Sequence, residues 1–241
     1  MTKPTWISGY RIVFALAAIV AMGYQLYHQY DTIDNYNPVN FFSFFTIESN
    51  LFAAVVFLLA ALTGLGQRPS KTFDLIRGAA VLYMTTTFVV YGLLLSGYQV
   101  ELQTTVPWVD TVLHRIFPLV LIADWIIAPP SRKINFRQGL IWLTYPAVYV
   151  VYTLIRGPRA DWYPYPFLDP REDGGYGRVA LYSVGIAIGI IAFIWVVTWV
   201  TRWRVKESAV PSNDRLSATG ETLGACQRPS IGGYSASTEA S

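Results

Sequence analysis

Residues 41–51 read FFSFFTIESNL, and this stretch guides the interpretation of the whole chain. A run of aromatic residues is followed by Thr46, Glu48, Ser49 and Asn50, and then by a long apolar segment. Hydrogen-bonding side chains at the start of an apolar helix are costly to place in lipid, so they indicate a functional site. The alternative is that they cap the helix or bond to its own backbone, as threonine often does in membrane helices.

The composition places this stretch in a membrane. Of the 241 residues, 53% are hydrophobic and 14% are charged, and the mean hydropathy is +0.37. A soluble globular domain carries about 25% charged residues. The apolar residues come in blocks of about 20, the length that crosses the hydrocarbon core. We therefore predict an all-α, polytopic membrane protein, in which the single cysteine, Cys226, allows no internal disulfide.

Six spans are predicted, so the expected fold is a bundle of six transmembrane helices. The spans cover 10–27, 44–65, 75–95, 109–127, 140–155 and 179–203. The first is longer than the apolar core of a signal peptide, so we expect it to stay in the mature protein. The fifth is short, and an amphipathic interfacial element is the alternative for it.

The chain is expected to form a transmembrane domain over 1–206 and a disordered tail over 207–241. The tail is rich in Ser, Gly, Thr and Pro, and has too few large apolar residues to fold. Lys and Arg flank the start of the first span, the second and fourth connections and the end of the last span. The first and third connections contain neither. The positive-inside rule then places both termini in the cytoplasm.

With this orientation, the second and fourth spans both begin at the outer face. Thr46 and His114 should therefore lie at similar depths, a few ångströms below the outer boundary. Thr46, Ser49 and Asn50 share one helix face through their i, i+3 and i+4 spacing, whereas Glu48 points away from them. Glu48 could instead form an ion pair near the interface with Arg115.

The fourth and fifth spans supply possible partners for Thr46. Asp110 lies four residues before His114 and could hold its imidazole, and Pro118 predicts a kink four residues after it. Asp124 lies deeper and could pair with the basic fourth connection. A polar stripe on the fifth span comprises Tyr145, Tyr149, Tyr152 and Arg156. We expect these three helices to converge on one outer cavity, although such a histidine is often structural and tyrosines often form an interfacial belt.

The fifth connection contains DWYPYPFLDP, residues 161–170. Its prolines restrict the backbone, and its aromatic residues suit a membrane–water boundary. One interpretation is a rigid, amphipathic lid over the outer cavity. The other is an external loop that rests on the headgroups.

Four segments together resemble one protein family. They are FFSFFTIESN at 41–50, LHRIFPLVLIADW at 113–125, TYPAVYVVYTLIRG at 144–157 and WYPYPFLDP at 162–170. They are similar to the bacterial six-span integral membrane proteins related to the animal androgen-induced-gene and androgen-dependent TFPI-regulating proteins. The resemblance runs over roughly residues 41–203, and it implies a location in the bacterial plasma membrane.

The resemblance implies an intramembrane threonine hydrolase. The animal relatives cleave fatty acid esters of hydroxy fatty acids with one threonine and one histidine, which correspond by position to Thr46 as nucleophile and His114 as general base. A threonine hydroxyl needs such a base, and histidine exchanges protons near neutral pH. From spacing alone, Asp110 would orient the imidazole. The supporting residues expected around this pair are Asp110, Asn50, Ser49, Tyr149, Tyr152 and Arg156, and the oxyanion donor is left open between Asn50, Tyr149 and Arg156.

The implied substrate is a lipid or acyl ester from the bilayer, with no cofactor and no metal. A second hypothesis is a transporter, a proton path or a lipid-binding receptor that uses Glu48, His114, Arg115 and Asp124. The concentration of polar groups in the outer half and the absence of a visible inverted repeat argue against transport. The sequence contains no phosphate-binding glycine loop, no metal-spaced His/Cys set and no nucleic-acid patch. It leaves the oligomeric state open.

Overall fold

The structure is a computed structural model that describes residues 5–63, 70–99, 102 and 106–204. The chain divides into two units, Met1–Lys206 and Glu207–Ser241. All the described residues belong to the first unit. The tail predicted over 207–241 lies outside the described residues.

Every regular element of the described residues is helical, as predicted. The long helices are α1 (Thr5–Thr32), α3 (Phe45–Thr63), α4 (Lys71–Val90), α8 (Thr144–Ala160) and α9 (Gly175–Arg204). The helix after the third connection consists of α5 (Pro107–Thr111), the π-helical segment η2 (Val112–Ile116) and α6 (Phe117–Ile127). The short elements are α2 (Pro38–Phe41), the π segment η1 (Tyr91–Leu95), α7 (Phe136–Gly139) and the 3₁₀ turns η3 (Leu140–Leu143) and η4 (Pro166–Leu168).

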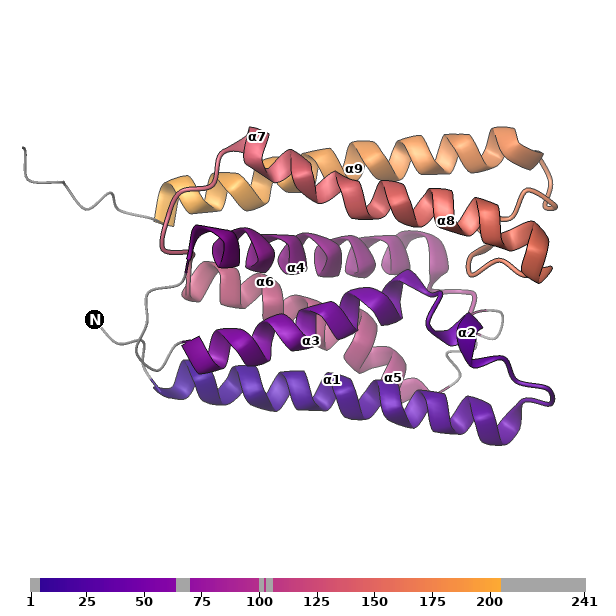
Figure 1. Ribbon diagram of the computed structural model, residues 1–241, viewed down its shortest axis with the longest axis horizontal. Coiled ribbons are helices and arrows are strands. Elements are labelled where there is room, and N and C mark those ends of the chain that lie inside the picture. Colours follow the sequence, from indigo (N-terminus) through magenta and orange to yellow (C-terminus); the bar gives the residue numbers. More distant parts are fainter. Residues whose placement is uncertain (1–4, 64–69, 100–101, 103–105, 205–241) are drawn as a thin grey trace, which may run out of the picture. The chain divides into compact units, whose positions relative to one another are not determined.

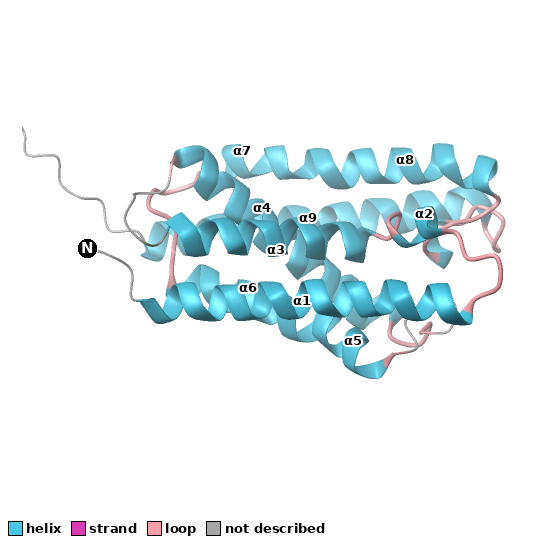
Figure 2. Ribbon diagram, turned by 60° about the horizontal axis from the view of Figure 1, so that its bottom comes forward, coloured by secondary structure: helices cyan, strands magenta, loops and turns pink. Residues whose placement is uncertain are grey.

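Successive long helices run in opposite directions, and the start of α1 and the end of α9 lie at the same end of this unit (Figure 1). A view turned by 60° keeps α3 between α1 and α8 (Figure 2). Alanine lines the contact between α1 and α3, where the fully buried residues are Ala15, Ala18, Ala21, Ala53 and Ala54. Small side chains let helix backbones approach closely in a membrane.

Within the described residues, five helices are long and apolar enough to cross a membrane, as expected of a multi-pass membrane protein. They are Thr5–Thr32, Phe45–Thr63, Lys71–Leu95, Phe136–Ala160 and Gly175–Arg204. Each overlaps one predicted span. The helix at the predicted fifth span is 25 residues long, so its length does not require the interfacial alternative. The predicted fourth span corresponds to α5, η2 and α6, which are not among these five.

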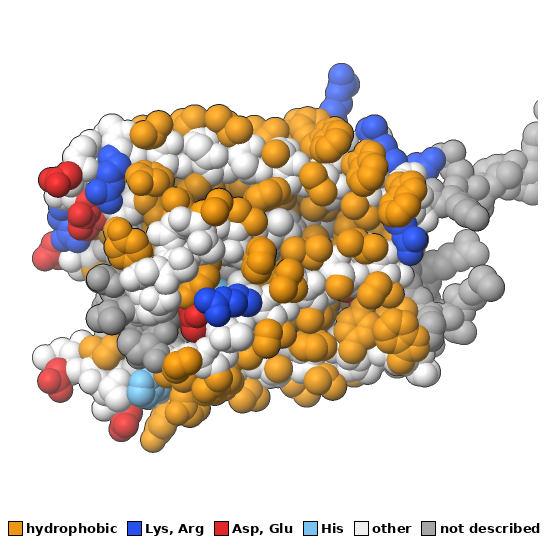
Figure 3. Space-filling view, turned by 180° about the vertical axis from the view of Figure 1, so that it is seen from behind, with side chains coloured by type: hydrophobic (Ala, Val, Ile, Leu, Met, Phe, Trp, Pro, Cys, Tyr) orange, Lys and Arg blue, Asp and Glu red, His pale blue; other side chains and the backbone are white. Residues whose placement is uncertain are grey.

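The surface agrees with this assignment. Hydrophobic side chains cover the middle of the face in Figure 3, and charged side chains gather mainly at its two ends. One end shows mainly Lys and Arg, and the other shows both signs. Only 17% of the most apolar window of α9 is buried inside the protein. We infer that most of α9 faces lipid.

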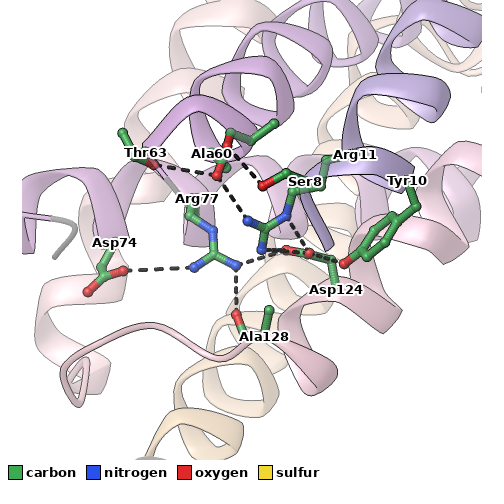
Figure 4. A network of polar contacts seen from close by, with 10 residues as sticks. Ser8, Tyr10, Arg11, Ala60, Thr63, Asp74, Arg77, Asp124 and Ala128 are labelled. Atoms are coloured by element: carbon green, nitrogen blue, oxygen red, sulfur yellow. Dashed lines mark hydrogen bonds and ion pairs between the residues drawn. The ribbon is translucent and has the colours of Figure 1, made fainter. Parts of the chain in front are cut away.

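A buried ionic cluster joins α1, α4 and α6 (Figure 4). Asp124 accepts hydrogen bonds from Arg11 Nε at 2.7 Å and Nη2 at 3.0 Å, and from Arg77 Nη2 at 2.8 Å. Arg11 is 1% exposed and Asp124 is 2% exposed. The two guanidinium groups also donate to the carbonyls of Ala60 at 3.1 Å and Ala128 at 2.8 Å. Each buried charge therefore has an opposite charge and hydrogen-bond partners, which burial requires.

The partners of Asp124 differ from the prediction. Asp124 instead faces the interior, where Arg11 and Arg77 reach it from the second turns of α1 and α4. Tyr10 also donates to its carboxylate, and Asp74 lies 3.9 Å from Arg77 Nη1. Two arginines and two aspartates leave the cluster with no net formal charge.

Candidate functional site

The first turn of α3 is capped by tyrosines from two distant segments. The first amides of a helix have no acceptor within it. The Phe45 amide donates to the Tyr149 hydroxyl on α8, and the Thr46 amide donates to the Tyr165 hydroxyl in the fifth connection, both at 3.3 Å. These bonds fix the start of α3 and place Thr46 beside Tyr165.

The Thr46 hydroxyl differs from those of other threonines in this protein. Thr85, Thr86 and Thr198 each donate to the carbonyl four residues earlier, at 2.7–2.9 Å. That acceptor is missing for Thr46 because residue 42 precedes α3. Thr46 is 9% exposed and lines two cavities. The structural alternative for Thr46, a bond back to its own helix, is therefore not formed among the described residues.

His114 is held firmly within η2. Its Nδ1 lies 3.0 Å from Asp110 Oδ1 and 3.2 Å from the Asp110 carbonyl oxygen, and only the carbonyl contact has hydrogen-bond alignment. Its ring stacks on Tyr91 with centroids 3.9 Å apart, and the Tyr91 hydroxyl bonds to Asp110. Since Nδ1 faces Asp110, Nε2 is the ring nitrogen left to accept a proton. The three residues thus form one buried group.

The irregularity predicted at Pro118 takes the form of a π turn. The Phe117 amide donates to the Val112 carbonyl, five residues earlier, and Pro118 follows in the first turn of α6. Proline offers no amide to the turn before it. A second π segment, η1, begins at Tyr91, which contacts His114. π turns often occur at functional sites.

Both predicted catalytic residues line a small cavity, whose lining is mainly apolar with a few polar groups. It has a volume of about 30 Å³, and its polar lining consists of Thr46, His114, Asp110, Gln25, Gln29 and Tyr165. One water molecule needs a cavity of roughly 10–15 Å³, so this cavity has room for about two water molecules. The structure therefore brings Thr46 and His114 to the same small cavity.

A second, larger cavity lies on the other side of Thr46. It has a volume of about 510 Å³, within the usual range for small-molecule sites, and its lining is predominantly apolar. Ala147 on α8 and Val184 on α9 line it and are also exposed, so it reaches the surface between these helices. Thr46, Leu95 and Tyr165 line both cavities. They form the shared wall between the cavities.

The polar stripe on α8 lies against the segment that precedes α3. Tyr149 donates to the Ser43 carbonyl at 2.9 Å, and the Tyr152 hydroxyl lies 3.2 Å from Ser43 Oγ. Arg156 donates to Asn40 Oδ1 at 2.6 Å. The stripe therefore docks α8 onto residues 40–45. Its fourth member, Tyr145, donates to Glu48, and the predicted ion pair between Glu48 and Arg115 is not formed among the described residues.

Asn50 and Ser49, which were predicted to support the site, form hydrogen bonds where α3 packs on its neighbouring helices. Asn50 Nδ2 donates to the carbonyls of Thr46 at 2.8 Å and Leu113 at 3.2 Å. Ser49 Oγ donates to the Thr46 carbonyl at 3.1 Å and lies 3.0 Å from Thr87 Oγ1. Both residues are fully buried, and neither lines a cavity. They connect α3 to η2 and α4.

The three residues considered as oxyanion donors already donate to other groups: Asn50 to backbone carbonyls, Tyr149 to Ser43 and Arg156 to Asn40. Sequence reasoning missed Tyr165, whose hydroxyl meets Thr46. The only signal was the proline-bounded motif PYP in the fifth connection. Tyr165, Phe167 and Leu168 are buried and line the larger cavity, so this part of the connection covers it as a lid would.

Comparison of the chain with protein-family models, with curated proteins and with solved structures finds no match.

Proposed function

We propose that this protein is an intramembrane hydrolase of lipid esters, with Thr46 as nucleophile and His114 as general base. One observation supports this proposal most. Thr46 and His114 line the same small cavity of about 30 Å³, while Thr46 also lines the apolar cavity of about 510 Å³. An acyl chain and the polar chemistry would then meet at one hydroxyl.

The proposal includes six membrane crossings with both termini in the cytoplasm. The helix from Pro107 to Ile127 would be the sixth crossing, since its rise of about 31 Å matches the hydrocarbon thickness. Three charged residues lower its hydropathy: Asp110 and Asp124 are buried against partners inside the bundle, and Arg115 is exposed. The bacterial plasma membrane and the family named above remain part of the proposal.

The proposed reaction begins when the ester carbonyl lies at Thr46 and its acyl chain fills the apolar cavity. Thr46 Oγ1 bonds to the carbonyl carbon, and its proton passes to His114 Nε2 while Asp110 holds the ring. The ester C–O bond then breaks, and the alcohol leaves with the proton from His114. A water molecule in the small cavity then gives a proton to His114 and attacks the acyl carbon. The bond from that carbon to Thr46 Oγ1 breaks, His114 returns the proton to Thr46, and the fatty acid leaves.

A lipid-binding protein without chemistry is the second candidate, because the apolar cavity alone could hold an acyl chain. Transport gains no comparable support. Asp124, which a proton path would need, is bonded to both Arg11 and Arg77 in the buried cluster.

Labelling with a fluorophosphonate probe for serine and threonine hydrolases tests the proposal. We expect the wild-type protein to be labelled, Thr46→Ala to remain unlabelled and His114→Ala to label at least about 100-fold more slowly, the usual scale for loss of a general base. Thr85→Ala is the matched control, because Thr85 bonds to its own helix and lines neither cavity.

Equal labelling of the wild-type and Thr46→Ala proteins would show that Thr46 is not the nucleophile. An unlabelled wild-type protein that still binds a fluorescent fatty acid, in competition with lipid, would favour the lipid-binding candidate. Equal amounts of folded protein in detergent, verified by size-exclusion chromatography, are needed for each comparison.

A further inference from the structure

Two hydrogen-bond donors lie beside Thr46, and the reaction described above leaves them without a role. One is the Thr46 backbone amide in the first turn of α3, and the other is the Tyr165 hydroxyl. The amide donates to this hydroxyl at 3.3 Å, and the hydroxyl also interacts with the Thr46 side chain. Both groups therefore lie where an ester carbonyl would have to approach the nucleophile.

Tyr165 and Tyr149 both cap α3, but only the Tyr149 hydroxyl donates its proton to a backbone carbonyl among the described residues. Tyr149 accepts from Phe45 and donates its proton to the Ser43 carbonyl at 2.9 Å. Tyr165 accepts from Thr46, and its proton has no backbone acceptor among the described residues. Burial raises the pKa of Tyr165 to about 12, so the hydroxyl keeps its proton at neutral pH. The hydroxyl interacts with the Thr46 side chain, so its proton lies where a ligand bound at Thr46 would accept it.

Packing holds the Tyr165 ring in place. The ring is 5% exposed, stacks on Phe167 with centroids 5.2 Å apart and contacts Phe44 edge-on at 5.7 Å. Arg178 Nη2 donates to the adjacent Pro166 carbonyl at 2.8 Å. Because Tyr165 also lines both cavities, its hydroxyl lies at their shared wall. A donor that is fixed before the substrate binds need not reorganise during the reaction.

We propose that Tyr165 is a catalytic residue, which together with the Thr46 amide stabilises the oxyanion formed when Thr46 attacks an ester. This inference rests on the proposed function. As the bond from Thr46 Oγ1 to the carbonyl carbon forms, the π electron pair of the carbonyl moves to its oxygen. The Tyr165 O–H and the Thr46 N–H donate to that oxygen. When the ester C–O bond breaks, the pair returns, and the alcohol takes the proton that His114 removed from Thr46.

The start of α3 favours the same charge. Exposed amides and the helix dipole stabilise a negative charge at a helix N-terminus, and α3 is 19 residues long. In the free protein the Tyr165 oxygen occupies the position of the acceptor for the Thr46 amide. Because the Thr46 amide nitrogen and the Tyr165 oxygen are 3.3 Å apart, a carbonyl oxygen placed beside both would accept from both donors while the Tyr165 ring keeps its place.

Steady-state hydrolysis of p-nitrophenyl acyl esters by the purified full chain tests this assignment. Tyr165→Phe removes only the hydroxyl, and we expect kcat to fall about 100- to 1,000-fold with little change in KM. Tyr163→Phe is the matched control in the same connection, because Tyr163 lines neither cavity, and its kcat should equal that of the wild-type protein.

Tyr149→Phe separates catalysis from helix capping, since it removes the corresponding bond at Phe45. We expect Tyr149→Phe and Tyr165→Phe to lower the melting temperature similarly, but Tyr165→Phe to lower kcat far more. Equal losses of kcat in these two variants would assign Tyr165 to capping and overturn the proposal. A higher KM with unchanged kcat in Tyr165→Phe would overturn it too.

Thr46→Ala distinguishes failure of this inference from failure of the proposed function. If Thr46→Ala is inactive and Tyr165→Phe keeps the wild-type kcat, only the assignment of Tyr165 is wrong. If Thr46→Ala is as active as the wild-type protein, or the wild-type protein hydrolyses no ester, the proposed function is wrong and the assignment fails with it.

Discussion

At the scale of single residues, Asn50 and Thr46 on the same face of α3 differ in whether their side chains bond to their own helix. Asn50 bonds to the carbonyl four residues earlier, as polar residues in membrane helices often do. Thr46 has no such carbonyl available, because α3 begins one residue before it. The availability of a helical carbonyl four residues earlier therefore explains why Asn50 bonds to its own helix and Thr46 does not.

Helical spacing was enough to predict that Asp110 reaches His114, four residues later. It could not predict Tyr165. Residues 46 and 165 are far apart in the sequence, and their contact depends on how the irregular connection folds. Tyr91 was missed for a similar reason, because its stacking on His114 depends on the packing of two π segments.

Asp110→Asn tests the orientation of the base. An amide at this position can donate to Nδ1, which would leave the proton on Nε2 and remove the base. We expect the rate of fluorophosphonate labelling to fall about 100-fold or more, as changes of tautomer do in hydrolase triads. Asp34→Asn, in the exposed connection after α1, should label like the wild-type protein. An unchanged rate in Asp110→Asn would exclude a role for Asp110 in orienting His114.

At the scale of elements, the connection between α8 and α9 determines where Tyr165 lies. Arg171 holds both ends of the turn, through Asp161 at 2.6 Å and Asp169 at 2.7 Å. Burial raises the pKa of Asp169, but hydrogen bonds from Arg171 outweigh it and hold that pKa below the usual range. The pair of Asp169 and Arg171 therefore stabilises the protein above the ordinary aspartate pKa. This stabilisation is lost as the pH falls through the lowered pKa of Asp169.

Gly157→Ala tests whether this connection positions the site. A Cβ atom at residue 157 would overlap the ring of Tyr163, so the ring and the connection after it must shift. We expect a loss of about 1–3 kcal/mol in the free energy of unfolding and slower labelling at Thr46. Gly23→Ala is the control, since nothing lies near its Cβ. Equal thermal midpoints for the two variants would show that the connection tolerates the shift.

At the scale of the whole described unit, composition and block length were sufficient to predict an all-helical membrane protein. The alternating helix directions follow from short connections between successive spans, and they bring the two described ends to one end (Figure 1). The buried ionic cluster was not predictable in this way. Arg11 and Arg77 look like flanking interfacial charges in the sequence, and only tertiary packing turns them toward Asp124.

Asp124→Leu tests whether the ionic cluster acts as a clamp, that is, whether it holds α1, α4 and α6 together. It leaves Arg11 and Arg77 buried without their main partner, and we expect a loss of about 3–5 kcal/mol in the free energy of unfolding. Arg11→Met combined with Asp124→Leu removes one charge of each sign and retains Arg77 beside Asp74. This double variant should recover most of the loss in a denaturation experiment. A double variant less stable than Asp124→Leu alone would contradict the clamp.

The π turn at His114 also has a consequence for how this chain should be aligned with others. A π turn contains one residue more than an α turn, and each residue of a helix turns the chain by about 100°. Removing one residue from Val112–Ile116 would restore an α-helix and rotate His114 relative to α6, away from the small cavity. A chain that keeps this histidine but lacks one neighbouring residue would therefore have lost the base. An alignment should therefore match the length of the π segment Val112–Ile116 as well as the histidine itself.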